Sequence, residues 1–217
     1  RDNLVRQRVD VISAVRFTLK SMGVKLRSPN TTCFARHARR ALEEEHPGLL
    51  VMIEPSLQVI DSMTEQIRSL ERSIEKLATE SYPETEFLRQ IAGVGTLTAL
   101  TFVLVIGDPM RFKRSRDVAA YLGLVPKRDQ SGDIDKQLRI SKAGDAYLRR
   151  LVVSAAQYVL GPFGPDCRLK RKGLELLERG GPRAKKKAVV ATARKLTLLM
   201  YALWRDEALY RPMKRAA

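Results

Sequence analysis

The chain has 217 residues and a formal net charge of +16, with 40 Lys and Arg residues against 24 Asp and Glu residues, which indicates a polyanionic partner such as nucleic acid. No apolar run reaches the roughly 18 residues that a membrane span needs, so we expect no membrane segment and no signal peptide. Cys33 and Cys167 are too few for a disulfide framework, which favours a reducing cytoplasm, and no His or Cys spacing fits zinc.

The first third of the chain is expected to be helical. An amphipathic pattern predicts a helix at 2–22 that ends at Gly23, and a short basic helix follows at about 32–45. After a break at 46–48, a long helix runs to about Thr79. Because the chain starts inside a helical pattern and without Met, we expect it to be part of a longer protein.

The long helix carries a narrow apolar seam with alternating spacings of three and four, as in a coiled coil. The seam consists of Ile60, Met63, Ile67, Leu70, Ile74 and Leu77. It can pack against the helix at 2–22 or against another subunit. We expect a helical hairpin that also helps subunits to associate into a homodimer or tetramer, and we assign residues 1–82 to this helical linker and coiled coil.

Residues 83–217 have the composition of a compact helical domain, and no strand pattern is convincing. We therefore predict an all-α protein in two parts. The second part is expected to contain a helical hairpin at 84–107, a short helix capped by Ser115, a polar loop at 127–140, a helix at about 142–160, and basic helices at about 166–178 and 183–206.

A Gly-x-Gly turn within the hairpin has the sequence form of a helix-hairpin-helix. Gly93 allows a tight reversal, and Gly95, which lacks a Cβ, would let a sugar-phosphate strand approach the amides that begin the next helix at Thr96. Such motifs bind the nucleic-acid backbone without reading sequence. The alternative is a tight turn between two packed core helices.

Basic residues are unevenly distributed along the chain. Residues 1–40 and 170–195 each carry ten basic and two acidic side chains, whereas 61–86 carries seven acidic and three basic ones. We infer separate duties for these regions. The candidate nucleic-acid-binding residues are Gly93, Gly95, Thr96, Lys127, Arg128, Arg139, Lys142, Arg149, Lys185, Lys186 and Lys187.

The polar loop is the best place for chemistry, because long ordered loops in compact domains are often functional. Ser131 is a candidate nucleophile, and the adjacent Gly132 would let a bulky substrate come close. Basic neighbours could neutralise the charge that grows on an attacked phosphate: Lys127, Arg128, Lys136 and Arg139. The alternative is a solvated turn.

Other nucleophiles fit less well. Ser141 directly precedes a predicted helix and is interpreted as its N-cap. Tyr147 and Tyr158 lack the histidine partners that a tyrosine recombinase needs, because both histidines lie in the N-terminal part. Asp133 and Asp135 alone are a weak metal site, so a self-contained metal nuclease is a minor hypothesis.

Several segments together match the pattern of one family. They are Arg1–Gly23, Ile91–Gly95, Arg111-Phe112, Ala119–Pro126, Ser131-Gly132, Arg139–Arg149 and Ala193–Leu196. In combination they resemble a family of bacterial insertion-sequence transposases, the IS110 family, which also includes the Piv DNA invertase and bridge-RNA-guided recombinases.

The resemblance implies that Ser131 attacks DNA and forms a covalent phosphoserine, with Arg128 or Arg139 steadying the charge. It also implies a RuvC-like domain whose four acidic residues bind Mg²⁺, a composite site shared between subunits, and a guide RNA that selects the DNA. On this reading the present chain holds no metal or other cofactor of its own.

The chain departs from the family pattern in two ways. Gln130 stands where many relatives have a first serine, although Ser131 itself is kept. We also expect the chain as given to lack the RuvC-like domain, and therefore to bind nucleic acid without recombining it. A different class of function, a non-catalytic helix-hairpin-helix clamp for RNA or DNA, is the alternative.

Overall fold

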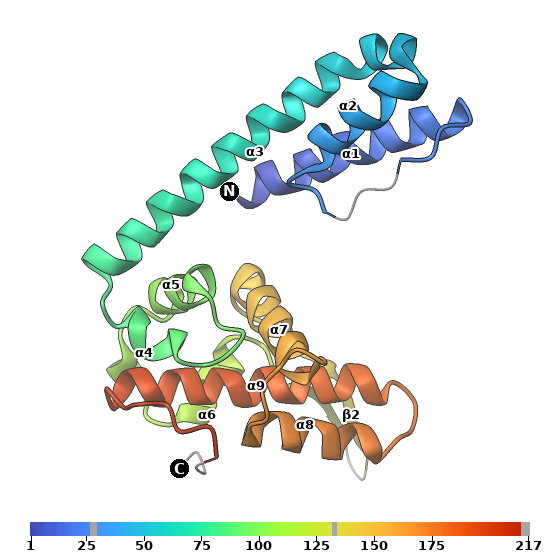
Figure 1. The fold of residues 1–217 in the computed structure, drawn as a ribbon. Helices are drawn as coiled ribbons and strands as arrows, with labels where there is room; N and C mark the ends of the chain where they lie inside the picture. Colours follow the sequence, from blue (N-terminus) through green and yellow to red (C-terminus); the bar gives the residue numbers. More distant parts are fainter. Residues whose placement is uncertain (27–29, 132–133, 214–217) are drawn as a thin grey trace. The chain divides into compact units, whose positions relative to one another are not determined.

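The computed structural model describes residues 1–26, 30–131 and 134–213. They belong to two compact units, Arg1–Lys76 and Leu77–Ala217, called unit 1 and unit 2 below. The described residues are predominantly helical and contain a single two-stranded sheet, which confirms the predicted all-α class (Figure 1). None of the described helices is both long enough and apolar enough to cross a bilayer.

Unit 1 consists of α1 (Asp2–Ser21), α2 (Phe34–Glu45) and the first part of α3 (Pro47–Ser81). Gly23 has a φ of +84°, a left-handed conformation that favours glycine, and α1 ends just before it as the sequence predicts. Helix α3 begins with Pro47, whose fixed φ suits the first helical position and whose missing N–H would have had no intrahelical partner.

The core of unit 1 forms where the apolar faces of its three helices meet. Its buried members are Ile12, Val15 and Leu19 of α1, Phe34, Ala35, Ala38 and Leu42 of α2, and Ile53, Leu57 and Ile60 of α3. The predicted seam is used unevenly, because Ile67 is 3 % exposed whereas Leu70 is 38 % exposed. Association of subunits through this seam stays a prediction.

Polar contacts between the helices of unit 1 fix the directions in which they pack. Arg1 pairs with Glu71, and Arg8 Nη1 donates to Thr64 Oγ1 at 3.2 Å, so α1 runs antiparallel to α3. Between α2 and α3, Arg39 Nη2 donates to a carboxylate oxygen of Glu54 at 2.9 Å. Hydrogen bonding to this guanidinium lowers the pKa of Glu54 from its usual value.

Unit 2 is organised around α9 (Ala184–Arg205), whose buried side includes Tyr201 and Trp204. The elements that pack against α9 are α4 (Thr85–Arg89), the 3₁₀ turn η1 (Pro109–Arg111), α6 (Ser115–Tyr121), α7 (Ala146–Leu160) and α8 (Arg168–Glu178). Helix α5 (Thr96–Ile106) packs against α4 and α7. Its Phe102 ring meets the ring of Trp204 edge-on, with centroids 6.3 Å apart.

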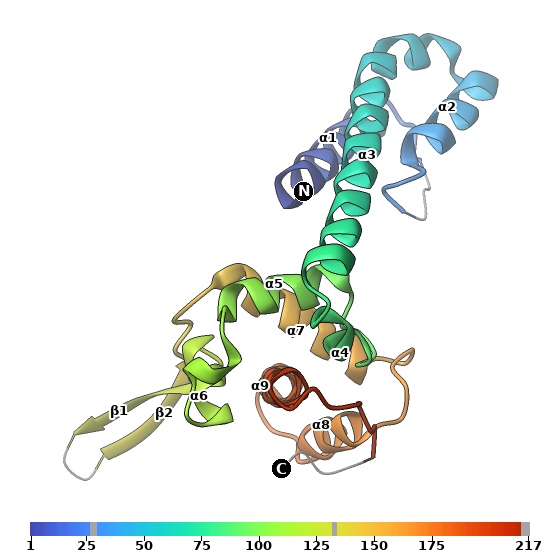
Figure 2. The same cartoon turned by 90° about the vertical axis from the view of Figure 1, so that its left-hand side faces the viewer.

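The expected polar loop is instead a β-hairpin, made of β1 (Pro126–Ser131) and β2 (Ile134–Ile140), which projects from unit 2 (Figure 2). The strands pair antiparallel from Pro126 opposite Ile140 to Ser131 opposite Ile134, with one irregularity near the base. The sequence held a partial signal for it, because a Gly-Asp pair is followed by apolar residues at three of four alternate positions, Ile134, Leu138 and Ile140, with Lys136 at the fourth.

Two predicted N-caps are wrong. Ser115 is the first residue of α6 and not its cap, because Arg114 precedes it in extended conformation. Ser141 lies five residues before α7, which is capped by Asp145 through a bond of 2.6 Å from the backbone N of Leu148. The helix cannot begin earlier, because the backbone between Ser141 and Asp145 is left-handed twice.

Candidate nucleic-acid interface

The Gly-x-Gly turn between α4 and α5 is held against α7. Gly93 has a φ of +89°, and a Cβ built there would lie 2.9 Å from Tyr158 Cδ1 and 3.1 Å from Ala155 O. A side chain at this position would therefore suffer both an unfavourable backbone conformation and a clash. The buried side chain of Ile91 anchors the start of the turn. Gly93 is thus required by the fold itself.

Gly95, two residues later, is different. Its φ of −86° is open to any residue, and a Cβ built there meets no heavy atom within 4 Å. It is exposed and precedes α5 without any side-chain cap, so the amides of the first turn, which begins at Thr96, have no capping acceptor. The fold does not need glycine here, and the space beside the helix start is open.

The base of the β-hairpin is a tight backbone crossing. Ser141 N donates to Val125 O at 2.9 Å and Lys142 N donates to Gly123 O at 3.1 Å, which extends the strand pairing. A Cβ on Gly123 would lie 2.4 Å from the backbone of Ala143, so no side chain fits there. This crossing fixes where the hairpin leaves the helical body of unit 2.

Arg149 strengthens the same crossing. Its Nη1 donates to Leu122 O at 3.1 Å and to Ala143 O at 2.8 Å, so the guanidinium of α7 joins the two chain segments that meet at the hairpin base. Arg149 is one of the residues that the sequence predicts to bind nucleic acid, and here it binds two carbonyl groups of the protein itself. It brings its positive charge to the base of the hairpin.

Three other predicted cations surround the hairpin base. Lys127, Arg139 and Lys142 are exposed, and no hydrogen bond or ion pair to a described side chain engages them. Ser131 ends β1, so its backbone lies at the far end of the hairpin from these cations. The side chains of 128–137, including Arg128 and Lys136, lie outside the described residues, as do Gly132 and the whole of Asp133.

Comparison with known proteins identifies the domain that carries this hairpin. Residues 85–169 match the model of the Transposase IS116/IS110/IS902 family. These residues, which make up less than half of the chain, are therefore similar to that transposase family. The match includes the turn at Gly93 and Gly95, the hairpin and α7, so it covers most of the geometry described above.

Similar curated proteins extend the likeness beyond residues 85–169. The transposase for insertion sequence element IS1111A of Coxiella burnetii is 31 % identical over 97 % of this chain and 58 % of its own length. A probable family 20 transposase of Pseudomonas aeruginosa is 29 % identical over 98 % of the chain and 63 % of its length. The pilin gene-inverting protein of Moraxella lacunata is 34 % identical over 55 % of the chain and 36 % of its length. The chain thus spans about half the length of the relatives it matches.

The two basic helices of unit 2, α8 and α9, differ in how their cations are engaged. Lys170 is half-buried, and its Nζ donates to Gly161 O at 3.0 Å and to Gly164 O at 2.6 Å, beyond the end of α7. The next two cations are paired: Arg171 with Asp166 at 2.9 Å and Lys172 with Glu175 at 2.8 Å. Hydrogen bonding from Arg171 lowers the pKa of Asp166.

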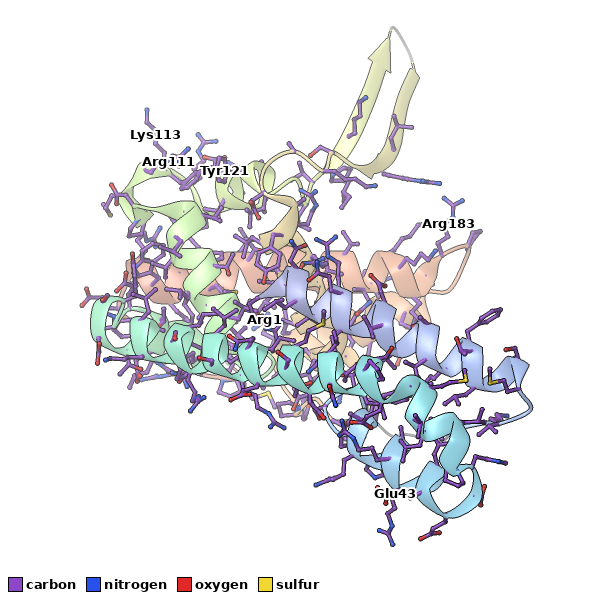
Figure 3. All side chains as sticks on the ribbon, turned by 90° about the horizontal axis from the view of Figure 1, so that it is seen from above. Arg1, Glu43, Arg111, Lys113, Tyr121 and Arg183 are labelled. Carbon is purple, nitrogen blue, oxygen red and sulfur yellow. The ribbon has the colours of Figure 1, made fainter. Side chains whose placement is uncertain are left out.

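The second basic run is free of such partners. Lys185, Lys186 and Lys187 are exposed in the first turn of α9, and no ion pair to a described side chain engages them. Arg183, in left-handed conformation just before α9, lies at the same end of this helix (Figure 3). These cations are available to an anionic partner of unit 2.

Metal ligands do not come together in the part of the chain that the structure describes. No group of three or more His, Cys, Asp or Glu side chains is positioned there to hold an ion. Asp133 is outside the described residues, and the side chain of Asp135 is not described. The described residues therefore offer no Mg²⁺ site of their own, and the family resemblance places none among them.

Sequence reasoning missed a second basic group beside the hairpin, on the segment from η1 to α6. Its members are Arg111, Lys113, Arg114 and Arg116. The closeness of four cations in six residues was visible in the sequence. Their placement was not, because it depends on contacts with Tyr121 and Tyr201, the latter about ninety residues away along the chain.

Proposed function

We propose that this chain is the strand-exchange part of a DNA transposase and that Ser131 is its nucleophile. The observation that carries the proposal is the position of Ser131 within the region that matches the transposase family, at the end of a hairpin strand whose base is fixed and surrounded by exposed cations. A projecting hairpin can bring a residue at its end to a phosphodiester without the helical body having to enter the DNA.

The proposed reaction is a transesterification. The Ser131 hydroxyl oxygen attacks phosphorus, a bond from serine oxygen to phosphorus forms, and the bond from phosphorus to one sugar oxygen breaks. The serine loses its proton and the departing sugar oxygen gains one. Because one ester replaces another, rejoining to a different sugar hydroxyl needs no ATP. Arg128 or Arg139 would stabilise the charge on the attacked phosphate.

The group that activates Ser131 is proposed to come from outside unit 2. A serine hydroxyl needs a base, and the chain's two histidines, His37 and His46, both belong to unit 1. We propose that a separate RuvC-like acidic domain holding Mg²⁺ supplies this help across subunits of a homo-oligomer. We assign no step to a metal held by this chain. A guide RNA that selects the DNA completes the proposal.

Binding is proposed to rest on two sequence-independent elements. The open amides at the start of α5, beside Gly95 and Thr96, suit a phosphate oxygen, because they carry the positive end of the helix dipole. The exposed lysines 185–187 add long-range attraction for the backbone. In this proposal the turn acts as a helix-hairpin-helix, with Gly93 shaping it and Gly95 leaving room for the strand.

The alternative function is a non-catalytic nucleic-acid clamp. It is favoured by the same open helix start and free lysines, because neither feature needs any chemistry. A clamp would bind DNA or RNA and leave strand cleavage to an enzyme elsewhere. The two functions differ in one respect: only the transposase forms a covalent bond to DNA through this chain.

The deciding experiment uses the transposase assembled with its acidic domain, guide RNA and DNA. Wild type is expected to give a protein–DNA adduct that survives denaturation. Ser131→Ala should abolish the adduct and strand exchange while DNA binding persists. The matched control is Ser141→Ala, because Ser141 is an exposed serine at the base of the same hairpin and should keep the adduct. An adduct that persists in Ser131→Ala would reject Ser131 as the nucleophile, and the clamp would remain as the function if that adduct is on no residue of this chain.

A further inference from the structure

The segment that follows α5 carries an unpaired basic group. Arg111, Lys113, Arg114 and Arg116 are all exposed, and no ion pair to a described side chain neutralises any of them. Four neighbouring cations repel one another, so the fold gains nothing from placing them together. Such a group is expected where an anionic partner supplies the missing charge.

The backbone beneath these cations is anchored to the core. Tyr201, a fully buried residue of α9, places its hydroxyl oxygen 2.5 Å from Pro109 O and 3.0 Å from Phe112 O. Asp108 Oδ1 accepts a bond of 2.7 Å from Met110 N and so caps η1. The basic group therefore projects from an ordered support rather than from a free loop.

One of the four cations is also ordered at its side chain. The guanidinium carbon of Arg111 lies 4.8 Å from the ring centroid of Tyr121 and 5.4 Å from that of Phe112, and the two rings are themselves 5.5 Å apart. Stacking on aromatic faces limits the side-chain freedom of arginine while its planar N–H donors stay available to a phosphate. Ordering of this kind lowers the entropy that binding would otherwise cost.

Tyr121 connects this basic group to the base of the hairpin. A Cβ on Gly144 would lie 2.0 Å from Tyr121 O, so the chain just after Lys142 runs against the chain at Tyr121. Arg111 and Lys113 lie together beside Tyr121, and Lys113 extends from unit 2 on the side from which the hairpin also projects (Figure 3). The cations of the 111–116 segment thus continue those at the hairpin base.

We propose that Arg111, Lys113, Arg114 and Arg116 bind backbone phosphates of the DNA segment whose phosphodiester Ser131 attacks. The inference rests on the proposed function for its choice of DNA, because a surface continuous with the base of the hairpin takes phosphates that flank the attacked one. Contacts to phosphates position a duplex without reading its sequence. This surface would therefore hold the DNA in register with the hairpin whatever the target sequence is.

The test measures the affinity of the 217-residue chain for duplex DNA of arbitrary sequence as a function of salt. The variant replaces Lys113, Arg114 and Arg116 by Ala, since none of the three makes a described ring contact or ion pair. If each meets one phosphate, the slope of log affinity against log salt should become less steep by up to about 2.7. The matched control, Arg171→Ala with Lys172→Ala, removes cations already paired with carboxylates and should leave the slope unchanged.

The test is completed by a second variant, Arg111→Lys, and a second ligand, duplex RNA. Arg111→Lys keeps the charge but loses the planar fork, so it should weaken DNA binding while the salt slope stays nearly unchanged. An unaltered slope in the triple variant would overturn the proposal, and so would a loss confined to duplex RNA. Neither result depends on Ser131, because binding is measured without cleavage. If the adduct persists in Ser131→Ala but the triple variant still has a less steep salt slope, Ser131 is rejected as the nucleophile and the DNA-binding surface at 111–116 is kept.

Discussion

Two basic runs in unit 2 look alike in sequence and differ in the folded chain. In the run 170–172, the fold itself engages each cation: Lys170 reaches two backbone carbonyls and its neighbours pair with Asp166 and Glu175. In the run 185–187, each lysine is exposed without a described ion-pair partner. Density of positive charge along a sequence therefore does not identify a binding surface. What matters is which cations the fold leaves unsatisfied.

The two glycines of the turn before α5 differ in the same way. Gly93 is needed by the fold, because its backbone is left-handed and its missing Cβ makes room for Tyr158. Gly95 has an ordinary backbone conformation and open space where a Cβ would be. A residue that the fold does not require is a better candidate for function than one that it does.

The largest expected effect is a loss of folding stability when Gly93, but not Gly95, is replaced. Gly93→Val should lower the free energy of unfolding by about 3 kcal/mol or more, because a β-branched side chain adds a clash with α7 to a left-handed backbone. Thermal or denaturant unfolding of the variant measures this loss. An unfolding free energy within about 0.5 kcal/mol of wild type would contradict the packing of the turn against α7.

The next effect compares the two basic runs directly. Replacing Lys185, Lys186 and Lys187 by Ala should flatten the dependence of log DNA affinity on log salt by up to about 2.7 units. Replacing Arg171 and Lys172 by Ala should change it little, because their charges are already compensated. Equal changes in the two variants would remove the distinction between satisfied and unsatisfied cations.

A smaller effect tests the open start of α5. Gly95→Val should weaken binding to duplex DNA by roughly tenfold, or about 1.4 kcal/mol, because the branched side chain blocks the helix-opening amides. The melting temperature should change little, since the position has room and an ordinary φ. Both quantities are measured on one sample. Equal losses of stability and binding would mean that the turn serves only the fold.

Helices were predictable from sequence to within a few residues, because apolar periodicity and helix-ending residues such as Gly23 act locally. The hairpin at 126–140 was not predicted, because its strands are short and strongly charged and only β2 alternates. The wrong N-cap at Ser141 has the same origin, since the strand pairing continues through its backbone N–H to Val125. The charges and turn-forming residues of this segment favoured a loop, whereas in the structure hydrogen bonds between the two strands make it a hairpin.

The sequence predicted which residue types form the candidate site better than it predicted how they come together. Exposed Lys127, Arg139 and Lys142 lie around the hairpin base as charges near a predicted loop would. The clamping of that base by Arg149 and the ordering of Arg111 on Tyr121 depend on contacts between separate elements. The hydroxyl of Tyr201 donates to Pro109 O of η1 from a distant part of the chain, and no local sequence pattern predicts such a hydrogen bond.

Distance along α9 adds a constraint on how DNA could lie on unit 2. Lys185 and Tyr201 are at opposite ends of this helix, about 24 Å apart at the usual rise per residue. The free lysines are at one end, and the basic segment supported by Tyr201 is at the other. One straight duplex segment of about seven base pairs covers that distance. Additive losses in the two sets of variants are expected if they act as separate contacts.

The most direct measurement locates the covalent bond itself. The adduct that the proposed reaction would form, with the proposed acidic domain, guide RNA and DNA present, is digested with nuclease and protease, and the modified peptide is sequenced by mass spectrometry. The account predicts a nucleotide linked through phosphate to Ser131, the last residue of β1. A nucleotide on Ser141, on Tyr147 or Tyr158, or on no residue of this chain would contradict it.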